Sequence, residues 1–201
     1  DTATGVAGLL ELAETLNDYD NERSLLYLAV TAEESGLLGS AYFAEYPPVD
    51  LSQIVAGFNF DALQPGGKSK DVIIVGYGAS QLEDILVRKL KKFGKYIRPD
   101  PEPEKGFFYR SDHISLSKKG VPTLYADAGF DKVDGGVEAG QRLADRYTTE
   151  DYHQPSDEYN SNWDLSGIVE QLSITAEIVL DLANSLNWPE WYEGNEFRSI
   201  R

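Results

Sequence analysis

The segment Thr31-Ala32-Glu33-Glu34-Ser35-Gly36-Leu37-Leu38-Gly39-Ser40 places two adjacent carboxylates directly after an apolar run, Leu25 to Val30. The run predicts a buried strand, and the turn and apolar stretch after the acids predict a short helix. Two neighbouring acids at the end of a core strand lose hydration and repel each other. Such a pair is expected where a cation offsets the charge or where one acid holds a proton. A metallohydrolase uses both arrangements, with one carboxylate on the metal and one as general base.

Apolar strands alternate with helical patterns along the rest of the chain. Strands are expected at residues 25–31, 54–60, 72–75 and 123–126, and helices at residues 6–16, 37–46, 82–93, 137–143 and 165–182. This alternation predicts one α/β domain over residues 1–201, a three-layer α/β/α sandwich around a mixed, largely parallel sheet. Ligands of such sheets bind at the carboxyl ends of strands, where Glu33, Glu34 and Asp61 all fall.

Composition excludes several classes of protein. The 201 residues carry 18 basic and 34 acidic side chains, a formal net charge of -16, which argues against nucleic-acid binding. No apolar run approaches the ~18 residues of a membrane span, so no membrane partner is expected. Because the sequence has no cysteine, any metal must be held by His, Asp and Glu. The chain opens on Asp1 directly against a helical pattern, which we interpret as a processed or truncated start.

The candidate metal ligands are Asp1, Glu34, Asp61 and His153. The sequence has only two histidines, His113 and His153, and His153 lies in a polar loop. A lone loop histidine is usually just solvated, and a single pair of acids is also a weak signal. Their combination in this order along the chain is far more specific.

Five segments resemble the motifs of M28-type zinc aminopeptidases. They are Asp1-Thr2-Ala3-Thr4-Gly5, Glu33 to Ser40, Asn59-Phe60-Asp61, Ser111-Asp112-His113 with the downstream Gly120-Val121-Pro122, and Tyr152 to Asp157. The second and the last of these segments are the most specific, and the resemblance covers essentially the whole chain. It implies a zinc-exopeptidase-like fold and an enzyme that hydrolyses the N-terminal peptide bond of a peptide.

The resemblance also implies which residues hold metal. In the intact family enzyme Asp1 would bridge two zinc ions. Glu34 and His153 would complete one of the two sites with ordinary zinc ligands. Asp61 would belong to the other site. The ligand types favour zinc over cobalt or manganese.

The remaining implied roles concern catalysis and the substrate. Glu33 would stay off the metals as the general base, and Tyr152 would help to stabilise the tetrahedral oxyanion. Arg110 and Asp61 are candidate substrate contacts. A free peptide N-terminus is cationic, so an acid-rich pocket suits such a substrate. His113 is expected to be a packing or outer-shell residue.

The chain departs from the family pattern at its start. Members carry a further His ligand in an H-x-D segment upstream of the bridging Asp, and this chain begins at that position, Asp1. We therefore expect the domain to be N-terminally truncated, without the first strands of the usual sheet, and its partner to be the missing segment of the parent protein. One zinc ion or none, and little or no activity, are expected of the chain alone. A piece of a larger protein, a truncated product, and a natural one-metal enzyme all stay open.

Two other functions stay open as well. Glutaminyl cyclases share the fold and keep a single zinc held by Asp, Glu and His, which makes a single-zinc acyltransferase the first alternative. Non-catalytic relatives are the second, although the retained Glu33, Glu34, Asp61 and His153 argue against it. The absence of cysteine permits a periplasmic or secreted location, where the family often works, and we expect that location here.

Overall fold

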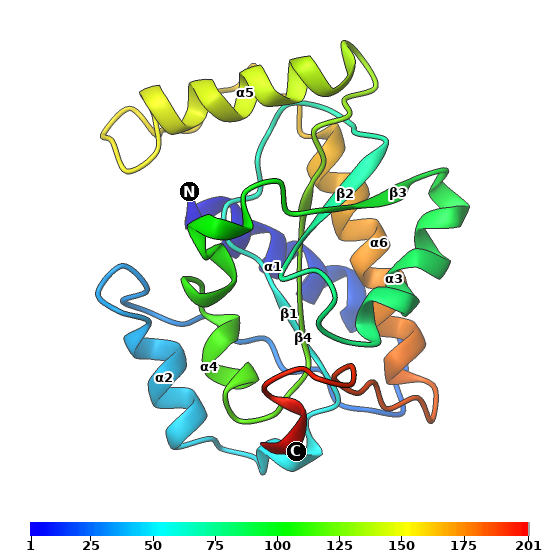
Figure 1. The fold of residues 1–201 in the computed structure, drawn as a ribbon. Coiled ribbons are helices and arrows are strands. Elements are labelled where there is room, and N and C mark those ends of the chain that lie inside the picture. The colour runs from blue at the N-terminus through cyan, green and yellow to red at the C-terminus, as the bar shows by residue number, and fades with distance from the viewer. Residues whose placement is uncertain (201) are drawn as a thin grey trace.

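The centre of the protein is a mixed β-sheet. In the computed structural model, which describes residues 1–200, the strand order is β1-β4-β2-β3 (Figure 1). The strands are β1 (Gly57–Asn59), β2 (Asp71–Val75), β3 (Tyr96–Pro99) and β4 (Thr123–Ala128). β1 runs parallel to β4 and β3 runs parallel to β2, whereas β2 and β4 are antiparallel. The expected mixed, largely parallel sheet is confirmed.

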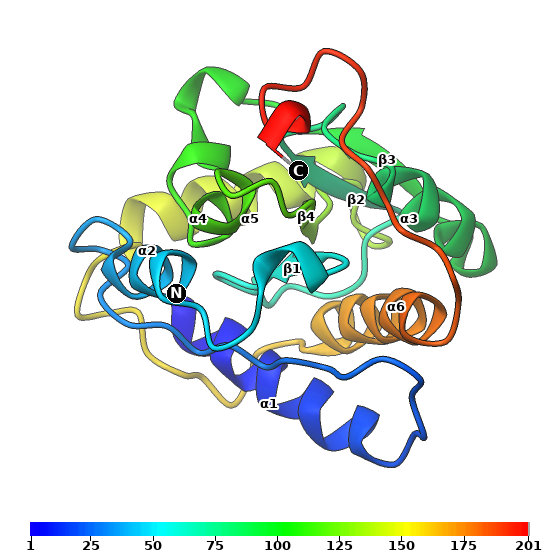
Figure 2. The ribbon, with the colours of Figure 1, turned by 90° about the horizontal axis from the view of Figure 1, so that it is seen from below.

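Helices cover both faces of this sheet, which confirms the three-layer α/β/α arrangement (Figure 2). One face carries α1 (Thr2–Asn17), α3 (Leu82–Leu90) and α6 (Ser166–Ala183). The other face carries α4 (His113–Ser117), against which α2 (Leu38–Glu45) packs. α5 (Gly136–Glu150) follows β4 and leads into the loop that contains His153.

The largest part of the core lies between the sheet and the pair α3 and α6. Its buried side chains come from β2, β4, α3 and α6, and include Val72, Ile74, Leu86, Leu124 and Ile178. Ile174, Ile178 and Leu182 of α6 recur at helical spacing, so this side of the helix faces the sheet. Each fully buried Leu or Ile contributes about 1.5–3 kcal/mol relative to an exposed one.

The C-terminal tail anchors the opposite face. Trp191 is 1% exposed, and its indole Nε1 donates a hydrogen bond of 2.8 Å to the carbonyl oxygen of Gly120. Phe197 packs beside it, and both side chains contact the cluster around Ile114 of α4. The aromatic tail, which has no regular sequence pattern, is therefore a structural part of this layer.

The prediction of a buried strand at residues 25–31 is wrong. The segment is extended but belongs to no strand, and Leu26 and Tyr27 are 56% and 38% exposed. A strand requires a neighbour that satisfies its backbone groups. Within residues 1–200, no backbone hydrogen bond joins residues 24–30 to another segment. β1 is also shorter than the expected strand at 54–60, since it pairs only with β4.

Three further differences concern polar segments. α5 extends to Glu150, well beyond the expected helix at 137–143, because the residues after Leu143 are mostly polar and an apolar pattern does not mark them. Its i,i+4 ion pairs include Arg146 with Glu150 at 2.9 Å. β3 and α4 were not expected at all. β3 is tied to β2 by an ion pair between Arg98 and the buried Asp71.

The structure also bears on membrane association. Across residues 1–200, no helix combines the length and the apolar character that crossing a bilayer requires.

Candidate metal centre

The two adjacent acids lie on a tight turn in front of α2. The carbonyl oxygen of Glu33 accepts hydrogen bonds from the backbone N–H groups of Gly36 and Leu37, at 2.9 and 2.8 Å. Ala32 and Leu37, on either side of the pair, have φ angles of 58° and 59°. Left-handed backbone is costly for residues with a Cβ and persists only where the surrounding structure imposes it. The turn therefore fixes where the carboxylates of Glu33 and Glu34 leave the chain.

Three of the four candidate ligands meet at this turn. The ligand atoms of Asp1, Glu34 and His153 all lie within 4.8 Å of one another. His153 Nε2 lies 2.7 Å from Glu34 Oε1 and 3.3 Å from Asp1 Oδ2. His153 itself has a φ of 59°, and the ring of Tyr152 stacks on its imidazole with centroids 3.8 Å apart. Residues from the start, the first quarter and the last quarter of the chain thus converge on one point.

Asp1 is positioned by the first turn of α1. The hydroxyl of Thr4 donates to the carbonyl oxygen of Asp1 at 3.0 Å and accepts from the N–H of Leu63 at 2.8 Å. These contacts attach the start of α1 to the segment after β1.

Gly5 allows α1 to approach the chain after β1 this closely. A Cβ built on Gly5 would lie 2.2 Å from the carbonyl oxygen of Asp61 and 2.7 Å from that of Phe60. These neighbours are backbone atoms, which cannot swing aside as a side chain can. The Thr4-Gly5 part of the first motif is thus explained by packing beside the site.

Gly5→Ala is therefore expected to destabilise the fold by about 1–3 kcal/mol, as overpacked sites do. Thermal unfolding followed by circular dichroism measures the change. Ala7→Ser, at an exposed position of the same helix, is the matched control and should stay within about 0.5 kcal/mol of the parent chain. Equal melting temperatures for the two variants would contradict this account of Gly5.

The fourth candidate ligand, Asp61, lies outside this three-residue cluster and is held by a hydrogen-bond chain. Ser111 Oγ donates to Asp61 Oδ2 at 2.7 Å, and Asn59 Nδ2 donates to Ser111 Oγ at 2.8 Å. Thr2 Oγ1 also reaches Asp61 Oδ1 at 3.4 Å. The sequence reasoning gave Asn59 and Ser111 no role. Asn59 lies in the same motif as Asp61, and Ser111 lies in the same motif as Asp112. This shared position was the sequence signal that could have predicted their role.

The environment of Glu33 suits a general base. Burial, followed by the charges of Glu34, Asp61 and Asp112, raises the pKa of Glu33 to about 7, although His153 acts in the opposite direction. A base is most effective when its pKa lies near the working pH. Strong perturbation by burial together with specific charged neighbours also marks functional sites.

Comparison with known proteins identifies the family. The model of the peptidase family M28 matches residues 1–176. The chain belongs to peptidase family M28. Among solved structures, this M28 domain is similar to the aminopeptidase from Aneurinibacillus sp. strain AM-1, with 20% identity and a TM-score of 0.68 over 94% of this chain and 40% of that one. It is also similar to BSAP, a zinc aminopeptidase from Bacillus subtilis, with 16% identity and a TM-score of 0.67 over 98% of this chain and 45% of that one.

These two comparisons support the shared fold and also show how much of each aminopeptidase the chain covers. The M28 domain described here spans less than half the length of either aminopeptidase.

The donor set of the M28 domain fits a zinc ion. Zinc binds carboxylate oxygen and imidazole nitrogen at about 2.0–2.2 Å in tetrahedral geometry, which places ligand atoms about 3.4 Å apart. The separations of 2.7 and 3.3 Å lie at or just below this value and no pair of ligand atoms in the cluster exceeds 4.8 Å, so small side-chain adjustments would bring the three donors around an ion. Asp1, Glu34 and His153 would be the residues that hold it.

The other candidate residues surround this centre. Burial raises the pKa of Tyr152, with a further contribution from Glu34, so that its hydroxyl stays a hydrogen-bond donor at neutral pH. Arg110 is exposed, lies over the ring of Phe107, and is close enough to Tyr152 to counteract part of that shift. His113 is buried against aromatic rings, and burial lowers its pKa to about 3. It packs in the core, as expected.

Proposed function

We propose that this M28 domain is the catalytic part of a zinc-dependent aminopeptidase that hydrolyses the N-terminal bond of peptides. The observation that carries the proposal is the convergence of Asp1, Glu34 and His153 beside a carboxylate, Glu33, with a raised pKa. Such a set separates the two roles that the reaction requires, since three residues can hold a cation and one acid is left for proton transfer.

In this proposal a bound zinc ion would supply a Lewis acid that polarises the scissile carbonyl and acidifies the attacking water. Glu33 accepts the proton from that water and then delivers it to the leaving amine. The hydroxyl of Tyr152 donates a hydrogen bond to the oxyanion that forms at the carbonyl carbon. The stacking of the Tyr152 ring on His153, one of the clustered residues, supports this role.

The negative charge of the acids around the centre would favour a substrate with a free, cationic N-terminus. Asp61 is held by Ser111 and Thr2 next to the metal-binding cluster, and it contributes to the electrostatic field at Glu33. A cationic α-amino group would neutralise part of this uncompensated negative charge. Asp61 is therefore proposed as a substrate contact, and Arg110 as a second contact with the peptide.

Substrate blocking tests this proposal. In the whole protein, leucine p-nitroanilide should be hydrolysed at least about tenfold faster than N-acetyl-leucine p-nitroanilide, since acetylation removes the charge that pairs with the acids. Equal rates on both substrates would mean an amidase or endopeptidase rather than an aminopeptidase.

The second candidate is a glutaminyl-cyclase-like acyltransferase, favoured by the single three-residue cluster of Asp, Glu and His. Glutaminyl p-nitroanilide distinguishes the two reactions. An aminopeptidase releases p-nitroaniline and free glutamine, whereas a cyclase leaves the anilide intact and produces pyroglutamyl p-nitroanilide. Mass spectrometry of the products decides between them.

The proposal also covers the chain alone. Residues 1–201 alone are expected to show little activity, because within residues 1–200 the segment that leads to Glu33 is not supported by a neighbouring strand. A periplasmic or secreted location stays a prediction, to be checked by fractionation of the source cells.

A further inference from the structure

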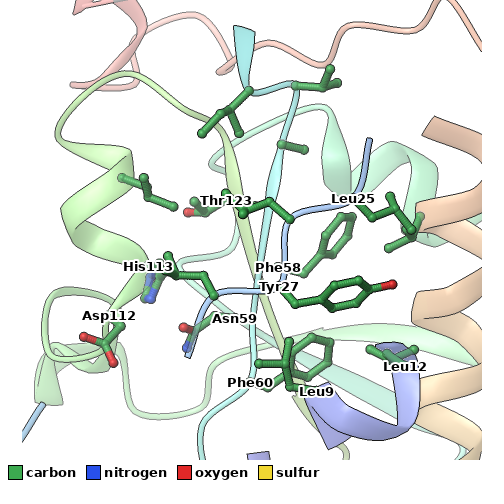
Figure 3. A pocket seen from close by; sticks show the side chains of 18 of the residues that line it. Leu9, Leu12, Leu25, Tyr27, Phe58, Asn59, Phe60, Asp112, His113 and Thr123 are labelled. Atoms are coloured by element: carbon green, nitrogen blue, oxygen red, sulfur yellow. The ribbon is translucent and has the colours of Figure 1, made fainter. Parts of the chain in front are cut away.

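The carboxyl end of β4 points side chains toward the face of the sheet that α4 covers. Asn59, the last residue of β1, lies opposite Tyr125 of β4 in the parallel pair. Asn59 donates a hydrogen bond to Ser111, just before α4. The ring of Tyr125 packs edge-on against His113 of α4, with centroids 5.3 Å apart. Figure 3 shows Asn59 on the side of β1 that faces Asp112 and His113, so both strands turn these positions toward α4.

An aspartate follows two residues later in each of these segments. Asp61 keeps the orientation of Asn59, because Ser111 accepts a hydrogen bond from Asn59 and donates one of 2.7 Å to Asp61. Asp127 keeps the orientation of Tyr125, because side chains two residues apart on a strand point to the same face. Asp61 and Asp127 are therefore neighbouring carboxylates at the carboxyl ends of two parallel strands.

The electrostatics of Tyr125 place Asp127 close to the groups that would carry out the reaction. Burial, followed by the charges of Asp127 and Asp61, raises the pKa of Tyr125 well above its usual value. Tyr152 and Glu33 contribute to the same shift, so Tyr125 is near both the proposed catalytic groups and Asp127. Asp127 is not one of the three clustered ligands, which leaves its carboxylate free for another role at the same site.

The carboxylate of Asp127 lacks a cationic partner. Its Oδ1 accepts a hydrogen bond of 3.1 Å from the N–H of Ala128, and within residues 1–200 the side chain forms no ion pair. Burial raises the pKa of Asp127 to about 7, and the charges of Asp61 and Asp100 add to this rise. The hydrogen bond from Ala128 and the charge of Lys132 oppose it. A partly buried carboxylate among other acids is stabilised in its ionised form by an added cation.

The region next to Asp127 is acidic and open. Asp100, which follows β3, lines a hollow of about 260 Å³ together with Phe108, Tyr109 and Glu196. Among residues 1–200, no Lys or Arg lines this hollow. Because the charge of Asp100 also acts on Asp127, the two acids belong to one electronegative region. Aromatic rings with acids around them accommodate the apolar stem of a long side chain and attract its cationic end.

The first residue of a bound peptide would direct its side chain into this region. In the proposed function Asp61 contacts the α-amino group, so the side chain of the same residue starts beside Asp61. Asp127 is the neighbouring carboxylate on the same face, within reach of a long side chain. Lysine and arginine carry their charge at the end of a flexible apolar stem. A neutral first side chain would instead leave the carboxylate of Asp127 desolvated without a partner, which is unfavourable.

We propose that Asp127 makes this site selective for peptides whose first residue is lysine or arginine, by pairing with the cationic end of that side chain. The inference rests on the proposed function, because it uses Asp61 as the contact of the α-amino group. It adds the class of substrate. The clustered metal ligands would serve any first residue, so the choice among first residues falls to Asp127.

Two substrates that differ only in one charge test the selectivity. Norleucine has the side chain of lysine without its terminal ammonium group. In the whole protein, kcat/KM for lysine p-nitroanilide should exceed that for norleucine p-nitroanilide by about tenfold or more, as for a charge pair shielded from water. Asp127→Asn keeps the size of the side chain and should lower this ratio by about tenfold. Asp134→Asn makes the same change at an exposed position and should keep the ratio. A ratio that is unchanged in Asp127→Asn, or that falls equally in Asp134→Asn, would overturn the proposal.

Binding of the free amino acids separates this inference from the proposed function. Lysine should raise the melting temperature of the whole protein more than norleucine does at the same concentration, and Asp127→Asn should remove the difference. If this difference is seen but neither p-nitroanilide is hydrolysed, the selectivity of Asp127 is supported and the proposed aminopeptidase is contradicted. Equal shifts with lysine and norleucine, with or without hydrolysis, would overturn the role of Asp127.

Discussion

Glu33→Gln should lower the turnover of leucine p-nitroanilide by the whole protein by about 10²–10⁴-fold, the range for loss of a general base. The amide keeps the size of the side chain and cannot accept the proton of the attacking water. Zinc affinity should stay within about threefold of the parent protein, because Glu33 is not one of the three clustered ligands. Steady-state kinetics and a zinc titration on the same preparation check the two halves of the prediction.

The neighbouring acid provides the matched control. Glu34→Gln makes the same chemical change one residue away, and it should lose zinc as well as turnover, because Glu34 Oε1 is part of the cluster. If Glu33→Gln left turnover intact, or if both variants lost zinc equally, the division of roles between the two acids would be wrong.

The pH dependence follows from the same carboxylate. With no ion bound, burial and the neighbouring acids raise the pKa of Glu33 to about 7. The base form is the ionised one, so the rate should rise with pH and reach a plateau. A bound cation favours the ionised form of Glu33. In the zinc enzyme, the midpoint of the rise in rate with pH should therefore lie at or below pH 7. A rate that falls as pH rises through this range would contradict Glu33 as the base.

His153→Ala should weaken zinc binding by about 100-fold or more. Loss of a residue that merely orients a ligand costs about 10–100-fold in metal affinity, and loss of the ligand itself must cost at least as much. His153 Nε2 is the only nitrogen in the cluster and contacts both Glu34 and Asp1. Competition with a chromophoric chelator measures the affinity.

The other histidine is the control for this experiment. His113→Phe replaces a neutral buried ring with another ring that can pack against Phe108 and Tyr125. Its zinc affinity should match that of the parent chain. Equal losses in His113→Phe and His153→Ala would mean that affinity depends on general folding rather than on the cluster.

The sequence predicted the sandwich and the three clustered residues because both follow from local patterns. Val72 and Ile74 of β2 and Ile178 of α6 follow apolar patterns that report burial directly, and the structure places them in one core. Glu34 and His153 lie in the two most specific motifs, and the fold brings these together with Asp1. The interpretation of residues 1–201 as one catalytic domain stays a prediction.

Other features depended on partners that a local pattern cannot report. The apolar run at 25–31 has the composition of a strand, yet pairing requires a neighbour that no part of residues 1–200 supplies. The hydrogen-bond chain from Asn59 through Ser111 to Asp61 joins segments 50 residues apart. α5 is longer than expected because the residues after Leu143 are mostly polar, so apolar periodicity does not detect the end of the helix.

The most direct test of the proposed function is chelation and restoration of the whole protein on leucine p-nitroanilide. Treatment with 1,10-phenanthroline should abolish hydrolysis, and zinc should restore it in the parent protein but not in His153→Ala. Hydrolysis that persists undiminished after the metal has been removed would contradict a zinc-dependent aminopeptidase built on Asp1, Glu34 and His153.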